Sequence, residues 1–215
     1  VQTCALPISI RFTCGLFLFQ LGVNECIKQF KKLYPHIHFD VYLTENTVDL
    51  MDAQFDLALR ITQKVADGLI ARPVCDIESI FCAHPHYLQD HTPLSHPSQL
   101  IQHECIAHHT HNQYWTLFDT DQQPQNYPLN VTFKSNDVIE LYQMCLKAEG
   151  IAMLPTLLVR QDLAQHRLQQ VFTDFSAPDL TLSLVYASRQ HLPKITQEFI
   201  AFVIENLNFY LNQQN

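Results

Sequence analysis

The chain has 215 residues, which suits one large domain or two small ones, and its 47% of hydrophobic residues is enough for a substantial core. Its formal net charge of −8 comes from 13 Lys+Arg against 21 Asp+Glu. This charge disfavours nucleic-acid binding by the chain itself, because neutralising phosphates supplies most non-specific affinity. The chain has only four glycines, which excludes glycine-rich phosphate-binding loops.

The sequence predicts no membrane-spanning helix. No segment reaches the length of uncharged hydrophobic residues that a membrane span needs, and residues 1–9 lack the pattern of a secretory signal. The seven cysteines are scattered, odd in number and without a CxxC pair. Reduced thiols are the simplest interpretation, so we expect a cytoplasmic location.

Strands alternating with helices are predicted for the first part of the chain. Alternating hydrophobic and polar residues indicate strands, and hydrophobic residues at helical spacing indicate helices. The expected elements are a strand at 8–13, a helix at 21–34 ended by Pro35, a strand at 37–43, a short helix from 46 or 47 to 51, and a strand at 56–60. This order predicts parallel strands in a right-handed βαβ arrangement.

The remaining chain is predicted to be mixed in the same way. Residues 112–127, around Trp115, are expected to be polar and irregular. The other expected elements are extended segments at 69–74 and 77–83, helical turns at 87–88 and 99–100, strands at 105–107 and 130–134, helices at 138–147 and 157–163, an extended segment at 168–172, a strand at 180–188 and a last helix opened by Pro193.

The stretch from Phe133 to Pro155 gives the first indication of a ligand site. It reads as a strand end, a polar turn, a helix and a second strand, and Gly150 stands where a residue with positive φ commonly ends a helix. A helix N-terminus offers unsatisfied N–H groups and a partial positive charge that often face a ligand. We hypothesise that Asn136 and Asp137 edge a small-molecule pocket. The alternative is that they only cap the helix.

Six runs of sequence then follow a distinctive order. They are FKKLYPHIHFDVYLTENTVDLMDAQFDLALRI, LIARPV, FCAHPHYL, HPSQLIQHECI, SNDVIELYQMCLKAEGIAMLP and LVYASRQHLPKITQEFIAFV. Together they resemble the effector-binding domain of LysR-type transcriptional regulators. The resemblance covers residues 8 to 207; no single run is diagnostic, but the ordered set is specific.

The resemblance implies an α/β fold with two Rossmann-like lobes joined by two crossing strands, the type 2 periplasmic-binding-protein-like architecture. Residues 1–79 and 183–215 would form lobe I, and residues 80–182 an inserted lobe II. A small effector, for which a small organic acid is one candidate, would bind in the cleft between the lobes. Its binding would shift the conformation and assembly of the regulator, and so control transcription.

The resemblance also implies partners. The domain would form a homodimer or tetramer, with the helix at 21–34 of one chain near the helix at 138–147 of its partner. DNA would be bound only through a winged helix-turn-helix domain, which is expected ahead of Ile8 and is missing from this chain. We expect no membrane partner.

The same resemblance implies a set of effector-binding residues. Many family members have Ser or Thr where this chain has Cys14 and Gly15, and an anionic Asp137 would weaken a preference for anionic effectors if it points into the cleft. The implied residues are Cys14, Gly15, Leu16, Thr44, Arg60 and Ile61 of lobe I, and His108, His109, Asn136 and Asp137 of lobe II.

Histidines are the main feature that favours another chemistry, since eight of the twelve lie between His84 and His111. Their spacing matches neither HExxH nor CxxC, so we expect no metal or cofactor. Cys14 is a candidate thiol sensor, although an ordinary buried cysteine is favoured. No catalytic motif is present, and an enzyme is not expected. The alternatives are a solute-binding receptor of the same fold and, less favoured, a metal-dependent enzyme using His and Cys.

Overall fold

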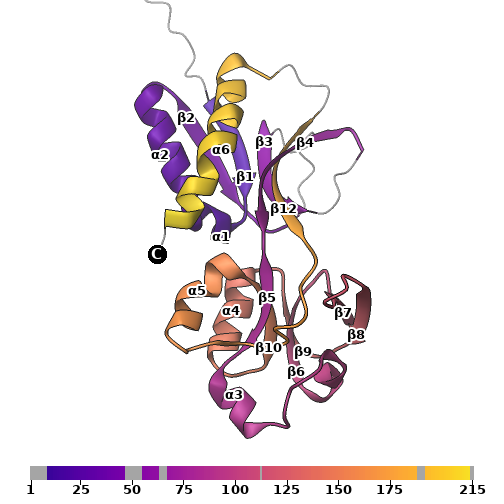
Figure 1. Cartoon of the computed structure of the whole chain (residues 1–215). Coiled ribbons are helices and arrows are strands. Elements are labelled where there is room, and N and C mark those ends of the chain that lie inside the picture. The colour runs from indigo at the N-terminus through magenta and orange to yellow at the C-terminus, as the bar shows by residue number, and fades with distance from the viewer. Residues whose placement is uncertain (1–8, 47–54, 63–66, 112, 188–191, 214–215) are drawn as a thin grey trace, which may run out of the picture. The chain divides into compact units, whose positions relative to one another are not determined.

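The computed structural model describes residues 9–46, 55–62, 67–111, 113–187 and 192–213. The chain divides into two compact α/β units. The first unit comprises residues 1–76 and 181–215, and the second comprises residues 77–180. Each unit has its own sheet and helices (Figure 1).

The first unit is built on a five-stranded sheet with the order β2-β1-β3-β12-β4. Its strands are β1 (Ser9–Cys14), β2 (His38–Leu43), β3 (Leu57–Thr62), β4 (Leu69–Ile77) and β12 (Leu180–Ala187). Strand β1 pairs in parallel with both β2 and β3, as the sequence predicts, and β12 pairs with β3 in the antiparallel sense. The carboxyl ends of three neighbouring parallel strands therefore meet at one edge of the sheet.

The first helical segment begins earlier than the sequence predicts. The expected start at residue 21 is wrong, because the helix opens at Leu16 as α1 (Leu16–Leu18) and continues through a π-helical stretch (Phe19–Val23) into α2 (Asn24–Leu33). A π turn inserts one extra residue into the helical repeat. The buried residues Leu18 and Val23 are consequently five apart, and this spacing hides the first turn from a search for helical periodicity.

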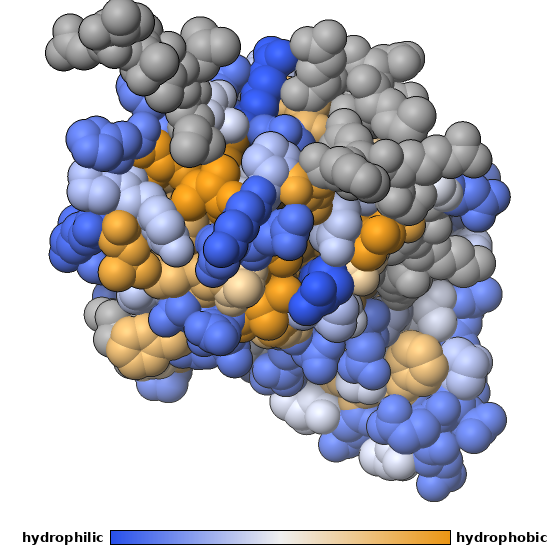
Figure 2. Space-filling model, turned by 90° about the horizontal axis from the view of Figure 1, so that it is seen from above, coloured by the Kyte–Doolittle hydropathy of each residue, from blue (hydrophilic) through white to orange (hydrophobic). Residues whose placement is uncertain are grey.

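Aromatic side chains hold the helices of the first unit against its sheet. The last helix, α6 (Lys194–Gln213), lies beside α2 on the same face of the sheet (Figure 1). The ring of Phe199 from α6 lies 5.0 Å from Phe30 of α2 and 4.9 Å from Phe39 of β2, in edge-on geometry. Such pairs add roughly 0.5–1.5 kcal/mol each beyond the burial of their area. Seen from above, hydrophobic residues gather in the middle of the view between hydrophilic ones (Figure 2).

The second unit has a five-stranded sheet of its own, with the order β11-β5-β10-β6-β9. Strand β6 pairs in parallel with β10 and β9, whereas β5 is antiparallel to β10. Its elements are β5 (Ser79–Ala83), α3 (Pro85–Asp90), the 3-10 helix η2 (Pro97–Gln102), β6 (Glu104–His108), β7 (Tyr114–Phe118), β8 (Pro124–Pro128), β9 (Asn130–Ser135), α4 (Val138–Leu146), β10 (Ile151–Pro155), α5 (Thr156–Ala164) and β11 (Gln169–Gln170).

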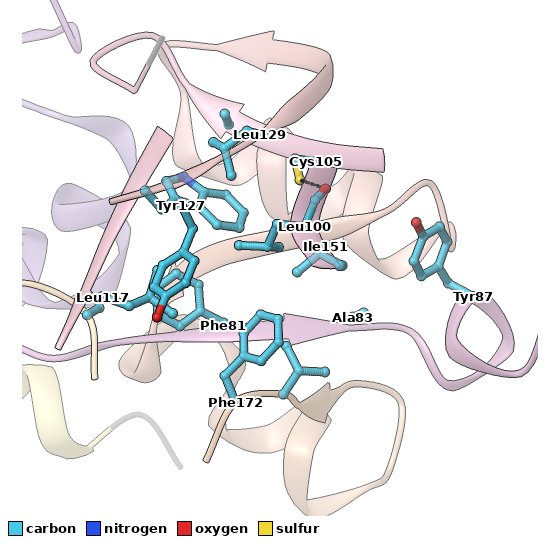
Figure 3. Packing of buried hydrophobic residues seen from close by; sticks show 14 residues of the cluster. Phe81, Ala83, Tyr87, Leu100, Cys105, Leu117, Tyr127, Leu129, Ile151 and Phe172 are labelled. Carbon is cyan, nitrogen blue, oxygen red and sulfur yellow. Dashed lines mark hydrogen bonds between the residues drawn. The ribbon is translucent and has the colours of Figure 1, made fainter. Parts of the chain in front are cut away.

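The segment expected to be irregular, 112–127, is instead mostly a β-hairpin of β7 and β8. Trp115 and Leu117 alternate with exposed or half-buried neighbours and are buried in the core of the second unit, where Trp115 lies 5.4 Å from the ring of Phe81. Figure 3 shows Leu117 and Phe81 in this core. At the turn, the Asp119 carboxylate accepts hydrogen bonds from the backbone N–H groups of residues 121 and 123. The prolines that bound β8 disguise the strand in the sequence.

The end of α4 corrects the role expected of Gly150. Ala148, not Gly150, has the left-handed conformation that ends the helix, with φ 63°. The N–H groups of Ala148 and Glu149 donate to the carbonyls of Cys145 and Met144 at 3.1 and 3.2 Å, which completes a Schellman motif. Gly150 has φ 150° and lies directly against the backbone of Glu104 in β6. A glycine is required there by close approach of the chain to β6.

Most of the other predicted elements are confirmed, with boundaries shifted by a few residues. The short helix expected to end at residue 51 and the last residue of the strand expected at 180–188 lie outside the described residues. Within the described part of the chain, no helix is long and hydrophobic enough to cross a membrane.

Candidate functional site

The first candidate site lies at the carboxyl edge of the parallel strands of the first unit. Cys14 ends β1, and its carbonyl accepts a hydrogen bond at 2.9 Å from the N–H of Thr44, the residue after β2. In register, Cys14 is paired with Leu59 of β3, so that Arg60 extends one residue beyond the end of β1. Ligands of open α/β sheets bind outside the carboxyl ends of the strands. The structure thus brings Cys14, Thr44 and Arg60 to the edge where a ligand is expected.

Arg60 supplies the positive charge of this edge. Its Nη2 donates to Thr13 Oγ1 at 2.9 Å and its Nη1 to the carbonyl of Leu59 at 3.0 Å. Burial lowers the pKa of Arg60, while the acidic groups of Cys14 and Glu45 raise it. A guanidinium stays protonated at physiological pH, so this edge holds a half-buried cation.

Cys14 is not built as a reactive thiol. Its side chain is fully buried, and burial raises the pKa of the thiol to about 12. The nearby Arg60 acts in the opposite direction, but its effect is smaller than that of desolvation. The thiolate is the reactive species, so Cys14 is inert at neutral pH. Arg60 could not be recognised from the sequence as a basic neighbour of Cys14, because the two residues are far apart in the chain.

Sequence reasoning missed Glu45, which belongs to the same edge. A Cβ atom placed on Gly15 would lie 2.6 Å from Oε2 and 2.7 Å from Cδ of Glu45, so the carboxylate fills the space that the glycine leaves. The signal was present in the sequence, because a glycine directly after a strand commonly marks close approach by another group. The two other predicted residues of the first unit, Leu16 and Ile61, lie on neighbouring elements. Leu16 opens α1, and Ile61 pairs with Leu182 of β12.

The second candidate site lies at the corresponding strand edge of the second unit. His108 ends β6, and its Nε2 donates to the carbonyl of Asn136 at 3.1 Å, while its Nδ1 accepts from the N–H of Thr110 at 3.3 Å. These bonds require the neutral imidazole with its proton on Nε2. Burial lowers the pKa of His108 and favours this neutral form. The ring therefore fastens the end of β6 to the start of α4.

The neighbouring predicted residues have unequal roles at this edge. The N–H of His109 donates to the carbonyl of Ser135 at 3.0 Å, and the His109 side chain is exposed. The carboxylate of Asp137 accepts from the N–H of Ile139 at 2.8 Å, which makes Asp137 the N-cap of α4. Asn136 is exposed immediately before this cap. The edge therefore exposes Asn136 and His109 to solvent, while Asp137 caps the helix and His108 is half-buried between β6 and α4.

The other histidines that the structure describes do not converge on a metal-binding geometry. His103 is fully buried, its Nδ1 lies 3.3 Å from the hydroxyl of Tyr87, and that hydroxyl donates to Glu104 at 2.6 Å. His91 lies nearby and stacks on the Tyr87 ring at 4.0 Å. Among the described residues, no group of three or more His, Cys, Asp or Glu side chains is arranged to hold a metal ion.

An open cavity of about 400 Å³ lies elsewhere in the second unit, beside β11. It is lined by Leu88, Leu94, Ser95, Gln169, Gln170, Val171, Phe172, Thr173, Asp174 and Phe175. None of the predicted effector-binding residues lines it. The half-buried cation Arg60 lies at the strand edge of the first unit and the helix cap Asp137 at that of the second unit, and neither residue lines this cavity.

The family profile of the LysR substrate binding domain matches residues 10–208 of the chain. The chain belongs to this family. The match includes every residue of the two strand edges described above, and it agrees with the resemblance seen in the sequence.

The chain is also similar to individual transcriptional regulators. It is 26% identical to the HTH-type transcriptional regulator PtxR of Pseudomonas aeruginosa over 199 residues, which are 92% of this chain and 64% of that protein. It is 27% identical over 183 residues to the regulator CrgA of Neisseria meningitidis, with 83% of this chain and 60% of that protein covered. The chain thus spans less than two thirds of the length of these relatives.

Solved structures agree on the fold. The regulatory domain of CrgA from Neisseria meningitidis superposes with a TM-score of 0.77 at 25% identity, covering 93% of this chain and 98% of that one. The full-length virulence activator AphB of Vibrio cholerae superposes with a TM-score of 0.78 at 24% identity, covering 93% of this chain and 68% of that one. The fold is therefore the two-lobed architecture of LysR regulatory domains, similar to type 2 periplasmic binding proteins.

Proposed function

We propose that this chain is the ligand-sensing part of a LysR-type transcriptional regulator, and that it binds a small effector through the strand-edge residues of its two units. The family match over residues 10–208 carries this proposal. The relatives are transcriptional regulators, so we propose a regulatory role and no enzymatic reaction.

The proposed contacts differ between the two edges. On the first unit, the effector would meet Arg60, Thr44 and the backbone around Gly15. On the second unit, it would meet Asn136 and His109, which are exposed at the start of α4 and after β6. His108 and Asp137 would act mainly by holding those groups in place, since the first donates to the Asn136 carbonyl and the second caps α4.

Effector binding would act by population shift. An effector that binds one arrangement of the domain more tightly moves the equilibrium toward that arrangement, by no more than its difference in affinity for the two. The control of DNA binding by this shift would involve the DNA-binding part of the regulator, as the names of the relatives suggest.

We also propose that copies of the domain associate. In the first unit, Leu33 of α2 and Tyr42 of β2 are 62% and 57% exposed, which is high for large hydrophobic side chains. Strand β2 is in addition an edge strand of its sheet. Sedimentation velocity tests this proposal, because a domain that stays monomeric at high concentration contradicts it.

A ligand screen tests the effector-binding proposal. Small organic acids, amides and amines are screened by thermal shift, and each compound that stabilises the domain is titrated by calorimetry into the wild type and single variants. Arg60→Ala and Asn136→Ala should each weaken binding by about tenfold or more, the loss expected for one hydrogen bond to a charged or buried partner. Arg72→Ala is the matched control, since Arg72 is exposed on β4. Binding that neither variant changes would refute the assignment of the site.

A further inference from the structure

The carboxylate of Glu45 occupies a defined position at the strand edge of the first unit. It lies against the α-carbon of Gly15, where any larger residue would collide with it, and its Oε1 atom is buried. The backbone next to Glu45 is held by two hydrogen bonds. The N–H of Thr44 donates to the carbonyl of Cys14 at 2.9 Å, and the N–H of Asn46 donates to Thr44 Oγ1 at 3.1 Å. These two hydrogen bonds at Thr44 place the neighbouring Glu45 at the strand edge where an effector is expected.

The charge at this edge is a pair of opposite groups. Arg60 is the cation, and both Cys14 and Glu45 act on it electrostatically. Because burial keeps the Cys14 thiol protonated at neutral pH, Glu45 is the one of these two groups that carries a negative charge. The chain therefore places its own carboxylate in the field of the cation that an acidic ligand would use.

We propose that Glu45 is an internal competitor at this edge, and that the effector is a carboxylic acid whose carboxylate takes the place of the Glu45 carboxylate near Arg60. This inference rests on the proposed function. Two carboxylates beside one guanidinium repel each other, so the ligand binds only as the Glu45 carboxylate moves away. Glu45 thus sets the concentration of acid at which the domain responds.

The displacement is sterically simple. The atoms that fill the space over Gly15 are the far end of the Glu45 side chain, which has three rotatable bonds and is only partly buried, so the carboxylate can move by rotation of the side chain without a shift of the backbone. Arg60 remains fixed by its bonds to Thr13 and Leu59 during this exchange. The ligand carboxylate can then lie near the fixed guanidinium of Arg60, in the space that Gly15 leaves because it has no side chain.

A titration followed by nuclear magnetic resonance tests the proposal with simple probes. Sodium benzoate and sodium acetate are titrated into the ¹⁵N-labelled domain, with benzamide as the neutral control, and the amide signals of Gly15 and Thr44 are followed. Glu45→Gln should bind the carboxylates on the order of tenfold more tightly than the wild type, since one nearby like charge is removed. Glu45→Ala should show the same direction.

Two further variants make the result specific. Glu198→Gln removes the same formal charge from an exposed position of α6 and should leave the benzoate affinity unchanged. Adding Arg60→Ala to Glu45→Gln should abolish the gain. Carboxylates that bind the wild type as tightly as Glu45→Gln, or that bind neither protein at the Gly15 edge, overturn the inference. Tighter binding of amines by the wild type would instead make Glu45 a recognition group and also overturn it.

Failure of this inference is distinguishable from failure of the proposed function. If amides or amines stabilise the domain while Glu45→Gln gains no affinity for acids, the sensing function stands and the competitor role of Glu45 falls. If no compound of any class binds the wild type or its variants, the proposed function itself falls.

Discussion

Gly150 makes the sharpest prediction about the stability of the second unit. In Gly150→Ala, the new methyl group would lie 2.5 Å from the carbonyl oxygen and 3.0 Å from the carbonyl carbon of Glu104. Both are backbone atoms of β6, which cannot rotate away as a side chain can. Overpacking of this kind costs roughly 1–3 kcal/mol, and an unfavourable positive φ adds roughly 1–3 kcal/mol. Alanine also lowers the conformational entropy of the unfolded chain, which offsets about 0.4–1 kcal/mol of this loss of stability. We expect a net loss of about 3 kcal/mol.

Ala148→Gly is the matched variant with the opposite sign. Ala148 is held at φ 63°, where a Cβ atom costs about 1–2 kcal/mol, and glycine removes that cost. The greater entropy of glycine in the unfolded chain offsets about 0.5–1 kcal/mol. A gain of about 0.5–1 kcal/mol should remain.

Urea unfolding followed by tryptophan fluorescence measures both changes. The chain has a single tryptophan, Trp115, which is buried in the core of the same unit. Its signal therefore reports the unfolding of the second unit by itself, and the midpoint and slope give the free energy. Substitutions that disturb no contact usually change the free energy of unfolding by less than about 0.5 kcal/mol. If Gly150→Ala changes it by no more than this, the close approach of Gly150 to β6 is refuted.

Three more outcomes follow from the polar groups. Tyr142→Phe should lower the unfolding free energy by about 1.5–3 kcal/mol in the same urea assay, because the hydroxyl donates at 2.8 Å to the buried carboxylate of Asp162; an unchanged midpoint would contradict this. Burial lowers the pKa of His103 and of His108 below 6.5, so protonating either imidazole is harder in the folded than in the unfolded chain. The free energy of unfolding should therefore fall as the pH is lowered from 7 through the folded pKa values of these two histidines. An unfolding free energy that does not change over this pH range, as measured by tryptophan fluorescence, would contradict the prediction. Cys14, whose pKa is raised to about 12, should resist iodoacetamide at pH 8 in the folded protein and react after unfolding, as read by mass spectrometry.

Local patterns explain which parts of the fold were predictable. The helix from Val138 and the strand from Ile151 follow directly from hydrophobic spacing, because each buries one face on neighbours that the pattern does not need to identify. The hairpin at 114–128 was missed, since its strands are short, contain prolines and gain their identity only by pairing with each other. The π turn hid the first helical residues for a related reason, because it breaks the repeat on which the prediction relies.

The candidate site was predictable only in part. The strand ends and the start of α4 could be located from sequence and from the family resemblance. The contact of Glu45 with Gly15, and the proximity of Arg60 to Cys14, arise from register between β1, β2 and β3. Residues 15 and 45, or 14 and 60, are too far apart in the chain for any local pattern to reveal such contacts.

We propose that the domain binds a small effector through residues at the strand edges of its two units. The most direct test of this proposal is calorimetric titration of the compound that most raises the melting temperature into the wild type, Arg60→Ala, Asn136→Ala and the control Arg72→Ala. We predict saturable binding to the wild type and the control, and a loss of about tenfold or more in each edge variant. Equal affinity for all four proteins would contradict the account.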